Sequence, residues 1–137
     1  MINTSTNATN EKDFKTKKIL IVDSNKSLCE MLTNYLIKCK HDCVCAVDGR
    51  NGLALIQKEK FDLILLNLQD QGFNGYDIID ALEKDGKLKE NKIFVWTTLD
   101  LSQPEIDDLL KRGVQSCLKK PVKVDVLLRT LDTVCQI

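Results

Sequence analysis

Four short stretches of the sequence place polar side chains that could do chemistry directly after runs of apolar residues. In chain order they are Asp23-Ser24-Asn25, Asn67, Thr97-Thr98 and Lys119-Lys120-Pro121. The first stretch supplies a carboxylate, the third supplies hydroxyls and the fourth supplies ammonium groups. Asn67 supplies an amide, which carries no charge and shares its nitrogen lone pair with its carbonyl. Asn67 is therefore predicted to be a poor nucleophile.

The elements that must position these side chains alternate along the chain. Apolar runs typical of strands lie at 19–22, 43–47, 63–66, 93–96 and 114–118. Stretches with the apolar periodicity of helices lie at 28–39, 50–59, 76–85, 104–112 and 124–135. Strict alternation of strand and helix predicts right-handed crossovers and a parallel sheet that is covered by helices on both faces.

The composition of the runs predicts the order of the strands. The first, third and fourth runs are apolar throughout, as expected of central strands, and the second and fifth are diluted, as expected of edges. The order 2-1-3-4-5 is the flavodoxin-like winding, so we predict an α/β fold, a (βα)5 three-layer sandwich with a five-stranded parallel sheet. Its ligand site is expected beyond the carboxyl ends of the strands, where the four polar stretches meet.

Length and charge limit the organisation of the chain. With 137 residues, 43% of them hydrophobic, one domain is expected over 17–137, preceded by a disordered polar tail over 1–16. Twenty basic residues balance twenty acidic ones, and no basic cluster is interleaved with aromatics, so nucleic acid is not a predicted partner. No apolar run approaches the roughly 18 residues of a membrane span, and no signal peptide is recognisable. A cytoplasmic location is predicted, with no membrane partner and with all six cysteines reduced.

From Lys17 to Ile137 the sequence resembles the receiver domain of two-component response regulators. The resemblance is carried by KKILIVDSN, FDLILLNLQDQGFNGYDII, IFVWTT and CLKKPV. It implies a first strand ending in two acidic residues, a third strand ending in an aspartate that accepts phosphate with the help of Mg²⁺, a Thr or Ser after the fourth strand, and a Lys followed by a cis-Pro after the fifth. The residues that match this pattern are Asp23, Gly75, Thr97, Lys120 and Pro121.

Other positions depart from the family pattern. Asn67 occupies the phosphate-acceptor position and Ser24 the second acidic position. Cys117 occupies the position of the aromatic residue that, together with the hydroxyl at Thr97, forms the switch of many receivers, and Gln71 replaces a frequent Pro. The resemblance therefore implies a vestigial pocket made of Asp23, Ser24, Asn67, Thr97, Lys120 and Pro121.

These departures predict an atypical receiver, a pseudo-receiver that acts as a phosphorylation-independent protein-interaction module and not as an enzyme. Asp23 and Lys120 are expected to pair directly and their charges sum to zero, so Mg²⁺ binding is expected to be weak or absent and no cofactor is predicted. The resemblance implies a protein partner at the face made by the fourth helix, the fifth strand and the fifth helix, about 104–135. A second copy of the chain is one candidate for that partner.

Several alternatives stay open. Asn67 could be natural or an engineered replacement of an acceptor Asp, and Ser24 and Cys117 favour the natural reading. Asp70, three residues further on, could be a surrogate acceptor, or the vacated pocket could sense a small ligand. The segment CKHDCVC (39–45) holds three thiols and the only His, and we favour packing over zinc or copper binding there. Trp96 is predicted to be a core residue.

Overall fold

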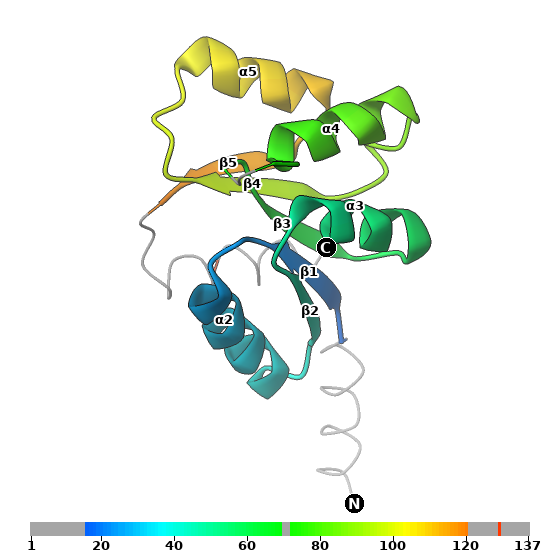
Figure 1. Cartoon of the computed structure of the whole chain (residues 1–137), viewed down its shortest axis with the longest axis vertical. Helices are drawn as coiled ribbons and strands as arrows, with labels where there is room; N and C mark the ends of the chain where they lie inside the picture. Colours follow the sequence, from blue (N-terminus) through cyan, green and yellow to red (C-terminus); the bar gives the residue numbers. More distant parts are fainter. Residues whose placement is uncertain (1–15, 70–71, 121–128, 130–137) are drawn as a thin grey trace, which may run out of the picture.

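The structure is a computed structural model that describes residues 16–69, 72–120 and 129 (Figure 1). Within these residues, strands and helices alternate along the chain. The strands are β1 (Lys18–Val22), β2 (Asp42–Ala46), β3 (Leu63–Asn67), β4 (Ile93–Thr97) and β5 (Ser116–Lys119). The helices are α2 (Lys26–Lys38), α3 (Gly49–Lys58), α4 (Gly75–Lys84) and α5 (Gln103–Arg112).

The strands form one parallel sheet in the order β2-β1-β3-β4-β5, which confirms the predicted flavodoxin-like winding. β1, β3 and β4 lie in the interior of the sheet and β2 and β5 form its edges. The strand predicted over 114–118 begins only at Ser116. Val114 lies just after α5 and is tied to its end, because its N–H donates to the carbonyl oxygen of Leu109 (3.0 Å).

Two hydrophobic cores lie on the two faces of the sheet. Ile19 and Ile21 pack with α2 on one face, whereas Leu20 and Val22 pack with α3, α4 and α5 on the other (Figure 1). Every residue of β3 and β4 is buried. Because these two strands are apolar on both faces, burial fixes them in the centre of the sheet. Their polar last residues are thereby carried to its carboxyl edge.

The helices that follow β3 and β4 begin with reciprocal caps. At α4, the side chain of Asn74 accepts a hydrogen bond from the N–H of Asp77 (3.1 Å), and the carboxylate of Asp77 accepts one from the N–H of Asn74 (2.9 Å). Ser102 and Glu105 form the same capping box at α5. Each box satisfies N–H groups that the first turn of a helix leaves unpaired. The starts of α4 and α5 are therefore determined by local sequence.

Gly75 lets the start of α4 approach the end of β3. A Cβ added at Gly75 would lie 2.4 Å from the carbonyl oxygen of Asn67 and 2.9 Å from the Cα of Leu68. Both neighbouring atoms belong to the backbone, so they cannot move aside as a flexible side chain could. The glycine is required for this packing between the loop after β3 and the helix that follows it.

Several predicted features lie outside the described residues. These are residues 1–15 of the polar tail expected over 1–16, Asp70, Gln71, Pro121 and, apart from Arg129, the helix expected over 124–135. They remain predictions.

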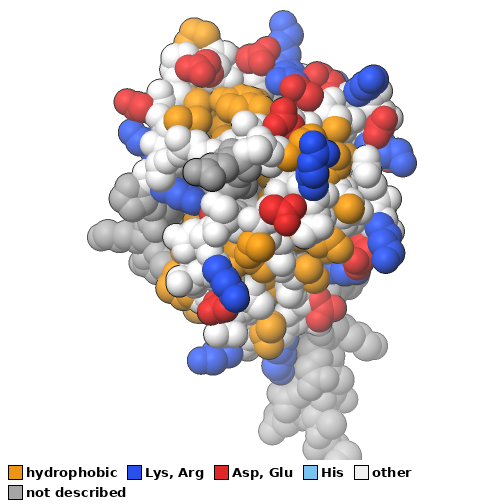
Figure 2. Space-filling view, viewed as in Figure 1, with side chains coloured by type: hydrophobic (Ala, Val, Ile, Leu, Met, Phe, Trp, Pro, Cys, Tyr) orange, Lys and Arg blue, Asp and Glu red, His pale blue; other side chains and the backbone are white. Residues whose placement is uncertain are grey.

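The described surface carries charges of both signs. Figure 2 shows Lys and Arg side chains interspersed with Asp and Glu side chains over the face in view. Arg112 at the end of α5 contacts the carboxylates of Asp80 and Glu83 in α4, which ties these two helices together. In the part of the chain that the structure describes, no helix is both long enough and apolar enough to cross a membrane.

Replacing Gly75 by Ala should destabilise the fold by about 1–3 kcal/mol, since overpacking against backbone atoms outweighs the better helix propensity of Ala. Urea unfolding followed by circular dichroism measures this change. Lys26→Ala, at the equivalent first position of α2, is the control. Its side chain is exposed, so the free energy of unfolding should change by less than about 0.5 kcal/mol. Equal effects of the two substitutions would contradict the role given to Gly75.

Candidate functional site

The carboxyl edge of the sheet brings predicted pocket residues together. They are Asp23 directly after β1, Asn67 at the end of β3, Thr97 at the end of β4 and Lys120 directly after β5. The N–H of Lys120 donates to the carbonyl oxygen of Thr97 (2.6 Å), which joins the last two of these positions. Asp23, Asn67 and Thr97 are at most 5% exposed. Their polar groups must therefore find partners within the protein.

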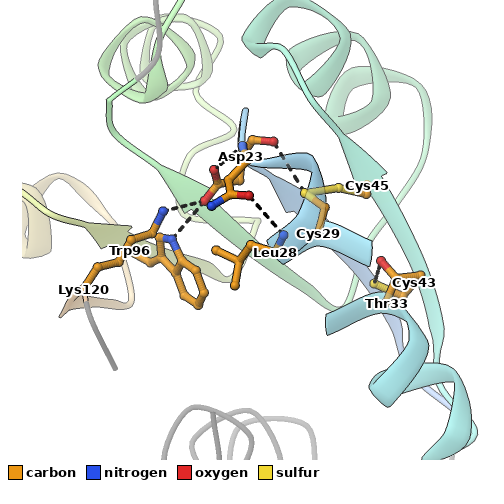
Figure 3. The surroundings of a disulfide bond; sticks show 9 residues. Asp23, Leu28, Cys29, Thr33, Cys43, Cys45, Trp96 and Lys120 are labelled. Atoms are coloured by element: carbon orange, nitrogen blue, oxygen red, sulfur yellow. Dashed lines mark hydrogen bonds and ion pairs between the residues drawn. A yellow bond between two sulfur atoms is a disulfide. The ribbon is translucent and has the colours of Figure 1, made fainter. Parts of the chain in front are cut away.

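The carboxylate of Asp23 is the centre of this site (Figure 3). Its Oδ2 accepts hydrogen bonds from Nζ of Lys120 (2.6 Å) and from Nε1 of Trp96 (3.0 Å). Its Oδ1 accepts one from the backbone N–H of Asn25 (2.9 Å). The side chains of Asp23 and Lys120 are only 3% and 16% exposed, so water screens their attraction weakly. The predicted ion pair between Asp23 and Lys120 is present.

Trp96 contributes more than packing. Its ring belongs to the core under α2, as predicted, and the residue is 4% exposed. Its indole N–H also donates to Asp23, and Nζ of Lys120 lies 4.7 Å from the ring centre, within cation–π range. This polar role was not predicted. The available signal was that a buried indole N–H needs an acceptor, and Asp23 was predicted at the same edge of the sheet.

Asn67 and Thr97 hold the loops that follow their strands. The amide nitrogen of Asn67 donates to the carbonyl oxygen of Gln69. The hydroxyl of Thr97 accepts a hydrogen bond from the N–H of Leu99 (3.0 Å). Thr98 donates to the side-chain oxygen of Gln69 and so connects the two loops. The amide and hydroxyl groups at these strand ends thus take part in organising the rim of the pocket.

Two further predicted positions, Ser24 and Cys117, differ in how far they are exposed to solvent. Ser24 is exposed beside Asp23. Cys117, at the position implied for the switch aromatic, is half-buried and packs against the core under α3, α4 and α5. Burial raises the pKa of the Cys117 thiol, so the uncharged form is favoured. The position is therefore filled by a small, neutral side chain.

Cys29 in α2 and Cys45 in β2 form a disulfide, with their Cα atoms 6.0 Å apart. That separation is usual for disulfides. The prediction that all six cysteines are reduced is wrong for this pair. It rested on the redox state usual in the predicted compartment, whereas the packing of α2 against β2 decides which thiols can meet.

Cys43 and His41, also in the segment 39–45, make ordinary hydrogen-bond contacts. Cys43 contacts the hydroxyl of Thr33 through its sulfur (3.6 Å), and burial raises the pKa of its thiol. Nδ1 of His41 accepts a hydrogen bond from the N–H of Lys17 (3.1 Å). Over residues 16–69, 72–120 and 129, no three His, Cys, Asp or Glu side chains are grouped as metal ligands would be.

Comparison with known proteins places this geometry in a family. The model of the response regulator receiver domain matches residues 19–132. The chain is 32% identical to the protein PilH of Pseudomonas aeruginosa over 117 residues, which are 85% of this chain and 96% of PilH. It is 31% identical to the DNA-binding response regulator MtrA of Mycobacterium tuberculosis over 111 residues, which are 81% of this chain but only 47% of MtrA.

Solved structures show the same fold. The chemotaxis protein CheY4 of Vibrio cholerae superimposes with a TM-score of 0.75 and 28% sequence identity, covering 88% of this chain and 99% of CheY4. The receiver domain of the Francisella response regulator 1452 gives a TM-score of 0.77 at 23% identity, covering 87% of this chain and 96% of that domain.

Replacing Lys120 by Met should cost about 3 kcal/mol of the free energy of unfolding, because it leaves the Asp23 carboxylate buried without its cation. Lys119→Met is the matched control. Lys119 pairs with Asp100 at the surface, where the two side chains are 59% and 90% exposed, so its loss should cost less than about 1 kcal/mol. Urea unfolding of both variants tests the difference. Similar losses would show that burial does not strengthen the pair at Asp23.

Proposed function

The chain belongs to the response regulator receiver domain family, and within it we propose that this protein is a pseudo-receiver that binds a protein partner without accepting phosphate. The observation that carries the proposal is the pairing of Lys120 with Asp23 beside an amide at the acceptor position, Asn67. The module works in the cytoplasm, as part of a two-component-type signalling pathway. It is not an enzyme.

The acceptor position lacks a nucleophile. A carboxylate can attack phosphorus and hold the resulting acyl phosphate, whereas the amide of Asn67 is uncharged and carries a delocalised lone pair. That amide is also buried and donates to the loop after β3. Asn67 therefore supports the loop and offers no atom for phosphotransfer.

The residues present do not fit the Mg²⁺ ion that receivers use. Mg²⁺ takes oxygen ligands and gives up its water reluctantly. Ser24 replaces one carboxylate and Asn67 another. Both oxygens of the remaining carboxylate, Asp23, accept hydrogen bonds from donors of the protein itself. With the charge of Asp23 balanced by Lys120, the pocket has little attraction for a divalent cation.

The partner surface that we propose is the face made by α5, β5 and the residues that follow, about 104–135. Its described part includes a half-buried edge strand, β5, and an exposed Leu110 on α5. A strand edge with no further strand beside it among the described residues, and exposed apolar side chains, are features that protein partners can cover. A second copy of the chain is one such partner.

Wild-type protein incubated with acetyl phosphate should incorporate no phosphate, as measured by intact mass spectrometry. The double variant Ser24→Asp, Asn67→Asp restores the missing carboxylates and should become phosphorylated, with Ser24→Asp alone as the control. Phosphate on the wild-type chain would contradict the proposal and favour the rival receiver that uses a surrogate such as Asp70.

An amide NMR titration with Mg²⁺ and then beryllofluoride, which mimics an acyl phosphate on an available carboxylate, tests the metal site. The amide signals of Asp23, Asn67, Thr97 and Lys120 should stay still over the millimolar range in the wild-type protein, because the carboxylate of Asp23 is already paired with Lys120. The double Asp variant provides the positive control. A saturable shift in the wild type would refute the pseudo-receiver assignment, and a shift with another small molecule would favour the ligand-sensor alternative.

A further inference from the structure

The disulfide links a helix to an edge strand beside the Asp23 centre. Cys29 lies in the first turns of α2, and Cys45 lies in β2 (Figure 3). We propose that Cys29 and Cys45 are a reversible dithiol–disulfide pair, a redox modification site that reacts with low-molecular-weight thiols and disulfides. The inference goes beyond the proposed function and uses only its cytoplasmic location. Disulfides of cytosolic proteins are usually transient or redox-sensing rather than permanent.

A surface depression gives small thiols access to the disulfide. The depression has a volume of about 390 Å³ and is lined by both cysteines together with Lys26, Glu30, Thr33, Asn34 and Val47. Cys45 is half-buried, whereas Cys29 is only 1% exposed. A small thiol therefore reaches the sulfur of Cys45 first.

A small dithiol can reduce the Cys29–Cys45 disulfide in two successive exchange steps. Its thiolate attacks Sγ of Cys45, the Cys29–Cys45 bond breaks, and the electron pair leaves on Sγ of Cys29, which then takes up a proton. The second thiol of the reagent attacks the mixed disulfide and releases Cys45 as a thiol. The reagent ends as a disulfide, having given two electrons to the protein. In the reverse direction, a small disulfide accepts two electrons and is released as two thiols.

The position of Cys29 favours it as the leaving group. Cys29 is the fourth residue of α2, a helix of 13 residues, so the positive end of the helix dipole lies close to its sulfur. Lys26 and Glu30 line the same depression with opposite charges, so the helix dipole is the main stabilising feature. It stabilises a departing thiolate, and a better leaving group speeds the exchange.

The disulfide contacts Asp23, the residue that binds Lys120 and Trp96. Sγ of Cys29 lies 3.4 Å from the backbone oxygen of Asp23. The N–H of Asp23 donates to the carbonyl oxygen of Ala46, the neighbour of Cys45 (3.0 Å). In the disulfide, Cys29 has no hydrogen to donate, but its reduced thiol can donate to the Asp23 carbonyl. Reduction therefore changes the hydrogen bonding of the residue that binds Lys120 and Trp96.

The chain contains an internal control and an internal reporter. Cys43 lies two residues before Cys45 in the same strand, contacts Thr33, and is not part of the disulfide. Trp96 is the only tryptophan and donates to the Asp23 carboxylate. Its emission can therefore report a change at Asp23.

The full chain should be equilibrated without denaturant in dithiothreitol and then in glutathione disulfide. Thiols are labelled after an acid quench and assigned by peptide mapping. Dithiothreitol should add two labels per chain, at Cys29 and Cys45, and glutathione disulfide should remove them. The emission of Trp96 should change with the same midpoint as the labelling. Cys43→Ser should leave both responses unchanged, and Cys45→Ser should abolish both.

The labelling of the wild-type chain decides the outcome even if a variant fails to fold. Labels that appear at Cys29 and Cys45 only after unfolding would overturn the proposal and make the disulfide purely structural. Failure of glutathione disulfide to re-form the bond, or pairing through Cys43 instead, would also overturn it, as would unchanged Trp96 emission during complete reduction. Thiol labelling does not depend on phosphate, so a chain that proved to be phosphorylated would leave this test valid.

Discussion

A single buried carboxylate organises the carboxyl edge of this sheet. Asp23 lies at the end of β1, yet its partners come from the end of β4 and from the residue after β5, 73 and 97 positions along the chain. Few exposed ion pairs hold such distant elements, because water screens them. Here burial removes the screening, and it also makes the carboxylate depend on the donors that Lys120 and Trp96 supply.

The uncharged amide of Asn67 lies at the end of β3, the strand next to β1, and so adds no second carboxylate beside the ion pair at Asp23. A carboxylate at the end of β3 would compete with Asp23 for the ammonium group of Lys120. With Asn67 in its place, Lys120 is committed to Asp23 and lies over the ring of Trp96. Together, Asp23, Lys120 and Asn67 then carry no net charge at the carboxyl edge.

The sequence predicted those features that depend on local pattern. The runs 63–66 and 93–96 are apolar throughout, so their central place in the sheet follows from burial alone. The pair between Asp23 and Lys120 follows from one charge of each sign at one buried edge. A buried indole N–H needs an acceptor, which was a signal for the hydrogen bond of Trp96, but β1 and β4 are separated by β3, so local pattern does not identify Asp23 as that acceptor.

The disulfide illustrates the same limit. Helical periodicity shows that Cys29 belongs to α2, but it does not describe how that helix docks on β2 or which sulfur atoms meet there. The start of β5 was misplaced because Val114 is apolar and buried like a strand residue, although its N–H completes the last turn of α5. The apolar side chain of Val114 indicates its burial, whereas no pattern in the sequence indicates its backbone hydrogen bond to Leu109.

The capping boxes of α4 and α5 have a consequence for the history of such a fold. Each helix begins by satisfying its own N–H groups from residues within the same turn, so neither start needs a metal ion or a phosphate nearby. The two helix starts can therefore stay in place whichever side chains the strand ends carry. Residues at the carboxyl edge can then change during evolution without loss of these caps.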